Sequence, residues 1–395
     1  MKNEIYRKNL LFYTNNMKDR KIINATGTLT SLGSNIISTN VMNSVTKISG
    51  IFVDMEQLSR DVGAYIADKL DVEAAYVTAS GSAGIVLSII TAIDKFCKKR
   101  NNVHPRTEKR IYIAIQKMQK TEFRELVEYA GASIIDYGND NLTTEVSLIN
   151  LLTEFKDKIA AVFHFVLDPM PGSLSLEKVI KIAHSFDIPV IVDAAAELPP
   201  KNNLSKFVRM GADAVIFSGG KMLGSFSNSG LLLGREEFIN AVSNIGPLHE
   251  TDGDSNPKIY QGRPMKVSKE TLIGTVTSID EFLDLNEQMW MDNLNKMNKE
   301  IVARLNEKTD IAIASIVSPK WYHPRPAIIP RVEIKLNKNL SSNELQKRLR
   351  EKLIYVYIDE GKVYINPQCL KDEDLPILIN QVIKELDTMR KLGCD

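Results

Sequence analysis

Apolar, strand-like runs alternate with segments of helical spacing up to about residue 245, and this alternation restricts the fold more than any other feature. The strand-like runs are nearly continuous in apolar residues, as in the segment IAAVFHFV at 159–166. Such strands, separated by helices, indicate a mostly parallel sheet covered on both faces. Short connections and right-handed crossovers make this a doubly wound α/β layer. We predict strands over 74–78, 110–115, 133–137, 159–166, 189–193 and 214–218, and helices over 55–70, 84–96, 121–131, 142–156 and 176–186.

The composition changes after about residue 245, where a stretch rich in Gly, Pro, Asp and Asn begins. An amphipathic pattern then predicts one long helix over 269–308, and strands and helices alternate beyond it. We therefore expect four parts, which are an N-terminal arm (1–20), a large domain (21–265), a long connecting helix (266–308) and a small α+β domain (309–395).

Charge and cysteine content exclude several classes of protein. Lysine and arginine total 50, aspartate and glutamate total 49, and the net charge of +1 leaves no basic excess for binding nucleic acid through its phosphates. The three cysteines form no CxxC pair, so neither a zinc site nor a disulfide framework is expected. The N-terminus lacks the apolar core of a signal peptide, and no run of about 18 apolar residues predicts a membrane span. We expect a cytoplasmic protein with no metal, membrane or nucleic-acid partner.

The strongest chemical signal is a carboxylate and a lysine at the ends of two successive predicted strands. Asp193 ends the run VIVD before three alanines, and Lys221 follows the next strand after Ser218 and two glycines. Ligands bind at the carboxyl ends of strands in open α/β sheets. A buried carboxylate there needs a cationic partner, and the protonated ring nitrogen of pyridoxal 5'-phosphate (PLP) is one.

Lys221 could hold this cofactor as a Schiff base and then act as the general base at the substrate Cα. Taken one at a time, the two residues also suit a helix-capping aspartate and a surface lysine. Their occurrence together at strand ends favours the PLP interpretation.

A second signal is the run YVTASGSAGI at 76–85, where a predicted strand passes into a helix. Backbone N–H groups at a helix start bind phosphate, and Ser80 and Ser82 add two hydroxyl groups. Alone the pattern is weak, because any turn between a strand and a helix favours Ser and Gly. Upstream of Lys221 in the same sheet, it supplies the phosphate site that PLP needs.

These segments resemble one group of fold-type-I PLP-dependent enzymes. The resemblance rests on INATGT (23–28), FVDMEQLSRDVGAYIADKLDVEAAYVTASGSAGI (52–85), VIVDAAAELPP (190–200), FSGGKMLG (217–224) and QGRPMKVSKETLIG (261–274). The group is the selenocysteine synthase (bacterial seryl-tRNA selenium transferase)-like one, which also contains D-glucosaminate-6-phosphate ammonia-lyase. The resemblance spans roughly residues 21–370 and implies a large PLP domain, a small C-terminal domain and an active site shared between the two subunits of a homodimer.

The resemblance also implies roles for individual residues. Lys221 would be the Schiff-base lysine and Asp193 the partner of the pyridine nitrogen, with Ala195 packed under the ring. Where relatives often place a histidine against the ring, this chain offers Gln119. The residues that would hold the phosphate are Ser80, Gly81, Ser82 and Ser218, and those that would approach the cofactor or substrate are Gly262 and Arg263.

Arginine binds a substrate carboxylate better than lysine does, because its guanidinium donates two parallel hydrogen bonds. Arg263 and Arg331 are the main candidates, and Arg325 is a third. Arg331 begins a predicted strand of the small domain, where an exposed arginine on an edge strand is the alternative interpretation. His164, near the end of the strand at 159–166, suits either a contact with the cofactor or a hydrogen-bonded place in the core.

The resemblance favours α,β-elimination or β-replacement on a small amino acid or amino sugar acid, with Lys221 removing the Cα proton. Selenium transfer to seryl-tRNA is the alternative, although only about 20 residues precede the motif at 23–28, and these leave no room for a tRNA-binding domain. An aminotransferase remains open as well. A non-catalytic scaffold or regulator with the PLP fold is the non-enzyme alternative, against which the presence of both Lys221 and Asp193 argues.

Overall fold

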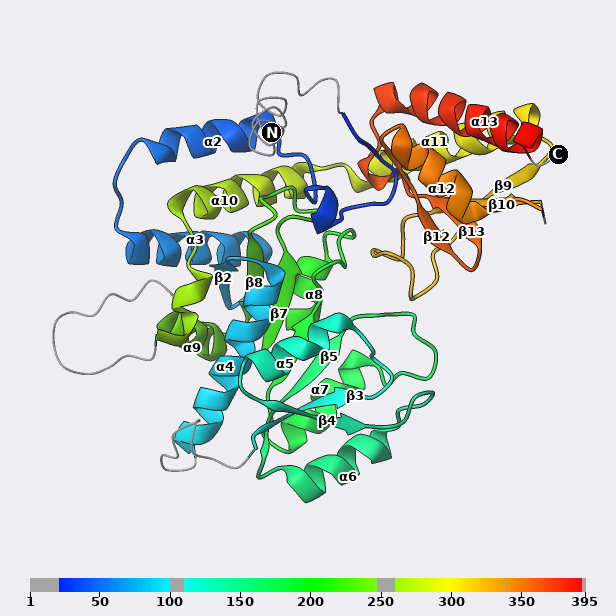
Figure 1. Cartoon of the computed structure of the whole chain (residues 1–395). Coiled ribbons are helices and arrows are strands. Elements are labelled where there is room, and N and C mark those ends of the chain that lie inside the picture. The colour runs from blue at the N-terminus through cyan, green and yellow to red at the C-terminus, as the bar shows by residue number, and fades with distance from the viewer. Residues whose placement is uncertain (1–20, 100–109, 247–259, 338, 393–395) are drawn as a thin grey trace, which may run out of the picture. The chain divides into compact units, whose positions relative to one another are not determined.

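The structure is a computed structural model that describes residues 21–99, 110–246, 260–337 and 339–392. Contacts divide the chain into two compact units, whose elements are labelled in Figure 1. One unit is Gly33–Glu287, and the other combines the chain up to Leu32 with the chain from Gln288 onward. The predicted N-terminal arm (1–20) lies outside the described residues. No helix in the described part of the chain is long and apolar enough to cross a membrane.

The larger unit is built on a seven-stranded sheet with the order β2-β8-β7-β6-β5-β3-β4. Neighbouring strands from β7 to β4 run parallel, whereas β8 pairs antiparallel with both β2 and β7. The predicted mostly parallel sheet is confirmed. The strands are β2 (Ala74–Thr78), β3 (Tyr112–Gln116), β4 (Ser133–Tyr137), β5 (Ile159–Phe165), β6 (Val190–Asp193), β7 (Ala214–Ser218) and β8 (Gly230–Gly234).

Strand β8 was not predicted. Its sequence GLLLG is short and bounded by glycines, and no helix separates it from β7. Without a helical crossover the chain returns as a hairpin, so β8 must run antiparallel to β7.

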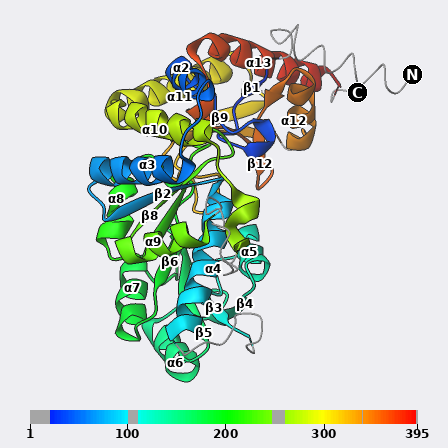
Figure 2. The ribbon, with the colours of Figure 1, turned by 90° about the vertical axis from the view of Figure 1, so that its left-hand side faces the viewer.

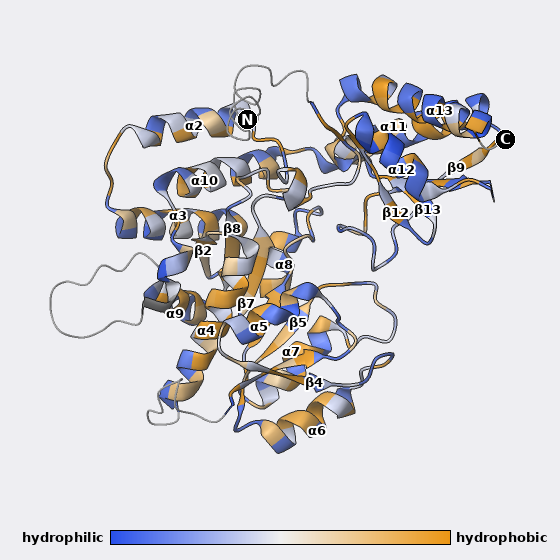
Figure 3. Cartoon of the chain, viewed as in Figure 1, coloured by the Kyte–Doolittle hydropathy of each residue, from blue (hydrophilic) through white to orange (hydrophobic). Residues whose placement is uncertain are grey.

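Helices cover both faces of this sheet, as the doubly wound expectation requires. Val190 and Val192 of β6 point to the core under α3, α6, α7, α8 and α10, whereas Ile191 points to the core under α4, α5 and α9. Figure 2 shows α4 and α5 on one side of the strands and α7 and α8 on the other, and Figure 3 shows β5 and β7 as strongly hydrophobic. The helices are α2 (Thr39–Ser49), α3 (Met55–Leu70), α4 (Gly81–Lys99), α5 (Glu125–Tyr129), α6 (Glu145–Phe155), α7 (Leu176–Ser185), α8 (Asn203–Arg209), α9 (Glu236–Ile245) and α10 (Lys269–Asp284).

The smaller unit contains a four-stranded antiparallel sheet with the order β12-β13-β10-β9 and a two-stranded parallel sheet of β1 and β11. Its apolar core joins these strands to three helices. The elements are β1 (Ile23–Asn24), α11 (Glu287–Lys308), β9 (Ala312–Val317), β10 (Arg331–Leu336), α12 (Ser342–Glu351), β11 (Ile354–Tyr355), β12 (Tyr357–Asp359), β13 (Lys362–Ile365) and α13 (Leu375–Leu392).

Two expected boundaries are corrected. Residues 21–32 belong to the smaller unit, because β1 pairs with β11 and the Ile23 N–H donates to the Leu353 carbonyl at 2.9 Å. The single helix expected over 269–308 is two helices, because Leu285 leaves the helical conformation (φ −57°, ψ 128°) between α10 and α11. Both helices bury one apolar face, so the amphipathic pattern continues across the break.

Candidate active site

Three segments of the larger unit converge at the carboxyl ends of β6 and β7. Asp193 ends β6 and Ser218 ends the adjacent parallel strand β7. The third segment is the start of α4, where a Cβ atom added to Gly81 would lie 3.6 Å from the Ala195 Cβ and 3.7 Å from the Ser218 Cβ. The structure therefore brings together residues that the sequence places more than a hundred positions apart.

The start of α4 is suited to bind an anion. The helix begins at Gly81, directly after β2, and runs to Lys99. The Ala83 N–H donates to the Ser80 hydroxyl at 3.0 Å, and the Thr78 hydroxyl donates to the Ser80 carbonyl at 2.8 Å, so this turn is well ordered. The first N–H groups of the helix and its dipole favour a phosphate at this end. The Ser80 hydroxyl retains its own hydrogen for donation.

Asp193 and Lys221 are half-buried and influence each other electrostatically. Burial raises the pKa of Asp193, against the opposing effects of the Ala195 N–H, which donates to Oδ1 at 2.9 Å, and of the Lys221 charge. Burial also lowers the pKa of Lys221, against the raising effect of nearby carboxylates, of which Asp193 has the largest. A lysine with a lowered pKa offers more of the neutral amine that attacks a carbonyl carbon.

The loop before Lys221 leaves no space for side chains at its two glycines. A Cβ atom on Gly219 would lie 2.0 Å from the Ser229 Oγ, and one on Gly220 would lie 2.6 Å from the Ser227 Cα. The Gly219 N–H donates to the Ser229 carbonyl at 3.0 Å. The pair Gly-Gly therefore lets the main chain of this loop pack directly against residues 225–229.

Gln119 is buried, with only 1% of its surface exposed. Its Nε2 donates to the Phe165 carbonyl at 2.8 Å, and its Oε1 accepts from the Phe165 N–H at 3.1 Å. The amide thus closes the end of β5 and uses both of its polar atoms in doing so. The contact of Gln119 with the cofactor ring stays a prediction, and it would use the flat face of the amide because both polar atoms are bound to Phe165.

Gly262 and Arg263 lie in the 3-10 turn Tyr260–Met265. A Cβ atom on Gly262 would lie 2.3 Å from the Ile245 carbonyl oxygen, so the turn packs closely on the end of α9. Arg263 lines a cavity of about 440 Å³ beside Asn228 and the start of α10.

Arg331 belongs to the smaller unit and is completely buried, which excludes the exposed edge-strand interpretation. Its guanidinium donates to the Ile329 carbonyl at 2.7 Å and to the Pro324 carbonyl, while Nε has no partner among the described residues. Burial lowers the pKa of Arg331.

His164 is a core histidine. It is 2% exposed, and its Nδ1 lies 3.2 Å from the Gln116 Nε2, which also donates to the Leu174 carbonyl at 2.9 Å. Burial lowers the pKa of His164 to about 4, so the ring is neutral at pH 7. In a neutral ring, Nδ1 accepts the hydrogen bond from Gln116 and Nε2 carries the proton.

Two carboxylates near Lys221 were not identified from the sequence. Glu197, which is 7% exposed, and Glu122 both raise the pKa of Lys221. Glu197 follows Asp193 by four residues in the run DAAAE, and that spacing after a strand end was the available signal. Glu122 precedes α5, and nothing in the local sequence relates it to Lys221.

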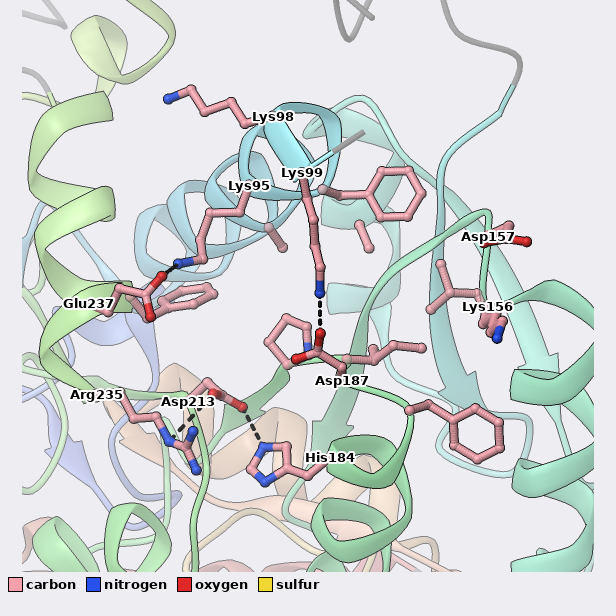
Figure 4. A pocket seen from close by; sticks show the side chains of 18 residues that line it. Lys95, Lys98, Lys99, Lys156, Asp157, His184, Asp187, Asp213, Arg235 and Glu237 are labelled. Carbon is pink, nitrogen blue, oxygen red and sulfur yellow. Dashed lines mark hydrogen bonds and ion pairs between the residues drawn. The ribbon is translucent and has the colours of Figure 1, made fainter. Parts of the chain in front are cut away.

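A larger cavity of about 1010 Å³ lies at the amino ends of the parallel strands, beside the start of β5 and the residues that precede β6 and β7. Figure 4 shows Lys95 directed toward Glu237 and Lys99 toward Asp187. Asp213 accepts from the His184 Nε2 at 2.9 Å and lies 3.5 Å from the Arg235 Nε. These basic groups have acidic partners, and the carboxyl ends of the parallel strands lie at the other end of the sheet, so we do not assign the site to this cavity.

The residues at the carboxyl ends of β6 and β7 fit PLP. Gly81 leaves space beside Ala195 and Ser218 at a helix start that favours phosphate. Lys221 supplies an amine of lowered pKa, and Asp193 supplies a half-buried carboxylate for a cationic ring nitrogen. The fold and this site define a fold-type-I PLP-dependent enzyme.

Comparison with known proteins places the chain within that class. The family model described as SelA, L-seryl-tRNA selenium transferase, matches residues 22–371, and the chain belongs to this family. The chain is 23% identical to D-glucosaminate-6-phosphate ammonia lyase of Salmonella typhimurium, over 91% of this chain and 94% of that protein. It is 21% identical to L-seryl-tRNA(Sec) selenium transferase of Clostridium perfringens, over 93% and 83% of the two chains.

Solved structures agree on the fold. A structure of D-glucosaminate-6-phosphate ammonia-lyase superposes with a TM-score of 0.75 at 22% identity, and the match covers 94% of this chain and 97% of the other. The class of PLP-dependent enzymes predicted from the sequence is confirmed.

Proposed function

We propose that this enzyme is a lyase that catalyses α,β-elimination on a small amino acid or amino sugar acid. The Cα proton and a β-substituent leave, and water hydrolyses the resulting enamine to a 2-oxo acid and ammonia. The observation that carries the proposal is the pair of Lys221 and Asp193, two half-buried groups that follow the adjacent parallel strands β7 and β6 and whose pKa values are shifted in opposite directions. The similarity to an ammonia lyase over nearly the whole chain supports elimination over transamination. β-Replacement uses the same first proton transfer and stays within the proposal.

The proposal gives each residue of the site one task. Lys221 holds the cofactor through Nζ and, once its amine is released, takes the proton from the substrate Cα. Asp193 keeps the ring nitrogen protonated by charge pairing. When bound, PLP supplies an electron sink for the pair left at Cα. Ala195 packs against the ring, Gln119 lies along it, and the phosphate is held by Ser80, Gly81, Ser82 and Ser218.

Substrate binding is assigned by charge. Arg263 is the proposed partner of the substrate carboxylate, since a guanidinium can donate two parallel hydrogen bonds. The other predicted partner, Arg331, is completely buried and donates to main-chain carbonyls, so it is not proposed to contact the substrate. Gly262 lets the main chain approach beside Arg263. The small-molecule substrate is consistent with the balanced charge of the chain.

We also propose that the enzyme is a cytoplasmic homodimer. Cys369 is a free thiol and the three cysteines of the sequence form no CxxC pair, as in proteins of reducing compartments. A two-fold dimer is the commonest soluble oligomer, and light scattering after gel filtration tests it.

Selenium transfer to seryl-tRNA is the second candidate, because the matching family model carries that description. A gel shift with seryl-tRNA tests it. Binding that survives about 0.15 M salt would favour transfer, and the lack of a basic excess predicts no shift.

The test of the proposed function is an absorption spectrum of the purified protein with PLP, followed by borohydride reduction and peptide mapping. We expect a visible band that reduction removes and a label on Lys221, with Lys95, Lys98 and Lys99 of the larger cavity unlabelled. Lys221→Ala should lose both the label and turnover. Asp193→Asn should keep the label and lower turnover at least about 100-fold, as for removal of a preorganised charge. A folded wild type without band or label would refute the proposal.

A further inference from the structure

The loop that carries Lys221 is held by a residue from a distant part of the chain. Asn35, which precedes α2, donates through Nδ2 to the Lys221 carbonyl at 3.1 Å and to the Ser225 carbonyl at 3.0 Å. We propose that Asn35 is a positioning residue, which sets the place of the Lys221 amine by holding the main chain at both ends of this loop. The inference rests on the proposed function of Lys221 and assigns no chemical step to Asn35.

The hydrogen bonds within the loop leave two acceptors available to the Asn35 amide. The Gly224 N–H donates to the Lys221 carbonyl at 3.0 Å, and the Ser225 N–H donates to the Gly219 carbonyl at 2.9 Å. These bonds close the loop on itself but leave one lone pair of the Lys221 carbonyl and the Ser225 carbonyl open. The two hydrogens of one amide nitrogen satisfy both acceptors at once.

A common support fixes the loop and the segment of Asn35. The Ser225 hydroxyl lies 3.0 Å from the Thr275 hydroxyl of α10, and both residues are completely buried. The Ser38 hydroxyl, three residues after Asn35, donates to Glu281 of the same helix at 2.9 Å. The Lys221 loop is therefore held on one side by α10 directly and on the other by Asn35, whose segment is tied to α10.

Within the described part of the chain, only the amide nitrogen of Asn35 forms hydrogen bonds with the loop, because the side-chain oxygen is unpaired. This oxygen, Oδ1, is buried and has no partner among the described residues. An unpaired buried acceptor is unfavourable, so the two donated hydrogen bonds must offset its cost. Aspartate has nearly the same shape as asparagine but would turn oxygen atoms toward both carbonyls. Asn35→Asp is thus a sharp substitution, because it reverses the interaction without changing the volume.

The experiment compares Asn35→Ala and Asn35→Asp with wild type and with Asn306→Ala. Asn306 is a matched control, since its amide donates to the Ala314 carbonyl at 2.9 Å and accepts from the Ala314 N–H at 2.8 Å within the smaller unit. Three kinds of measurement are made. They are hydrogen exchange of the peptide 219–229, kcat and KM for the α,β-elimination reaction of the amino acid substrate, and the pH midpoint of the visible band after PLP addition.

In both Asn35 variants we expect exchange of the peptide to be about tenfold faster, because one side of its support is lost. We expect kcat to fall at least about tenfold with KM within about threefold, because misplacement of a catalytic group acts on turnover. The pH midpoint of the band should move, and Lys221 should still take the label. Asn306→Ala should change none of these quantities.

Unchanged kcat in a labelled variant would overturn the inference even if exchange were faster, because the contact would then be structural only. A lower kcat without faster exchange would overturn it as well. If wild-type protein takes no label on Lys221, the proposed function fails, and exchange of the peptide alone decides whether Asn35 holds the loop.

Discussion

The side chain of Gln119 forms two hydrogen bonds with the main chain of Phe165, the last residue of β5, at 2.8 and 3.1 Å. The amide therefore replaces the next strand residue that Phe165 would otherwise pair with. A residue expected from the sequence to face the cofactor is thus also part of the sheet edge on which the site is built.

Gln119→Leu should destabilise the fold. Leucine has a similar volume but leaves the Phe165 N–H and carbonyl unpaired, and we expect a loss of about 1–3 kcal/mol in the free energy of unfolding. Urea denaturation measures it. Gln57→Leu is the control, because Gln57 pairs with Asp61 on an exposed helix surface and its loss should cost less than about 0.5 kcal/mol. Equal stability of the two variants would contradict the structural role of Gln119.

Gly81→Ala should weaken PLP binding without unfolding the protein. The added methyl group makes ordinary contacts at 3.6 Å with the Ala195 Cβ, so the fold tolerates it, but it occupies the space proposed for the cofactor. We expect the Kd for PLP to rise at least about tenfold, equivalent to about 1.4 kcal/mol. Absorbance titration measures the Kd. Gly50→Ala, where a Cβ would meet nothing within 4 Å, should bind as wild type does.

Lys221 should make the stability of the cofactor-free protein depend on pH. Its pKa is lowered in the folded chain, so between that value and the ordinary 10.5 the unfolded chain binds a proton that the folded chain does not. The free energy of unfolding of wild type therefore rises with pH in this window. Lys221 destabilises the folded chain fully below the window, and this destabilisation disappears as the pH approaches 10.5. Lys221→Met removes this rise. In urea denaturation from pH 7 to 10, the free energy of unfolding of the variant should fall relative to that of wild type as the pH increases. Parallel curves for the two proteins would contradict the lowered pKa of Lys221.

Arg331→Lys should lower stability and leave KM unchanged. Lysine cannot donate to the Ile329 and Pro324 carbonyls with the same planar group, and we expect a loss of about 2–3 kcal/mol. Arg304→Lys is the control, because Arg304 donates to Asn380 on the surface. Unchanged KM is expected because the Arg331 side chain is completely buried. A raised KM at unchanged kcat would contradict this structural role and return Arg331 to the substrate carboxylate.

The fold and the central pair of the site could be predicted because their signals are local. Continuous apolar runs with helical spacing between them indicate a parallel sheet, and the strand that ends in Asp193 lies where the pattern placed it. The start of α4 was predicted at Gly84 and lies at Gly81, a difference of one helical turn. Ser80, Gly81 and Ser218 lie at or directly after strand ends, as the pattern placed them, and their phosphate-binding role stays a prediction.

The contacts that arrange these groups could not be predicted, because they join residues far apart in the chain. Asn35 and Lys221 are separated by 186 positions, and Gln119 and Phe165 by 46. The pairing of β1 with β11 moved residues 21–32 into the smaller unit, and the burial of Arg331 depended on how its neighbours fold around it. The hydrophobic pattern of a helix or strand shows which of its faces is apolar, but it does not show which other element packs against that face. The sequence by itself determined the type of sheet and the positions of Asp193 and Lys221, the two groups proposed to carry the chemistry. The tertiary structure decided which distant side chains hold them, since hydrogen bonds between remote segments form only when the whole sheet is assembled.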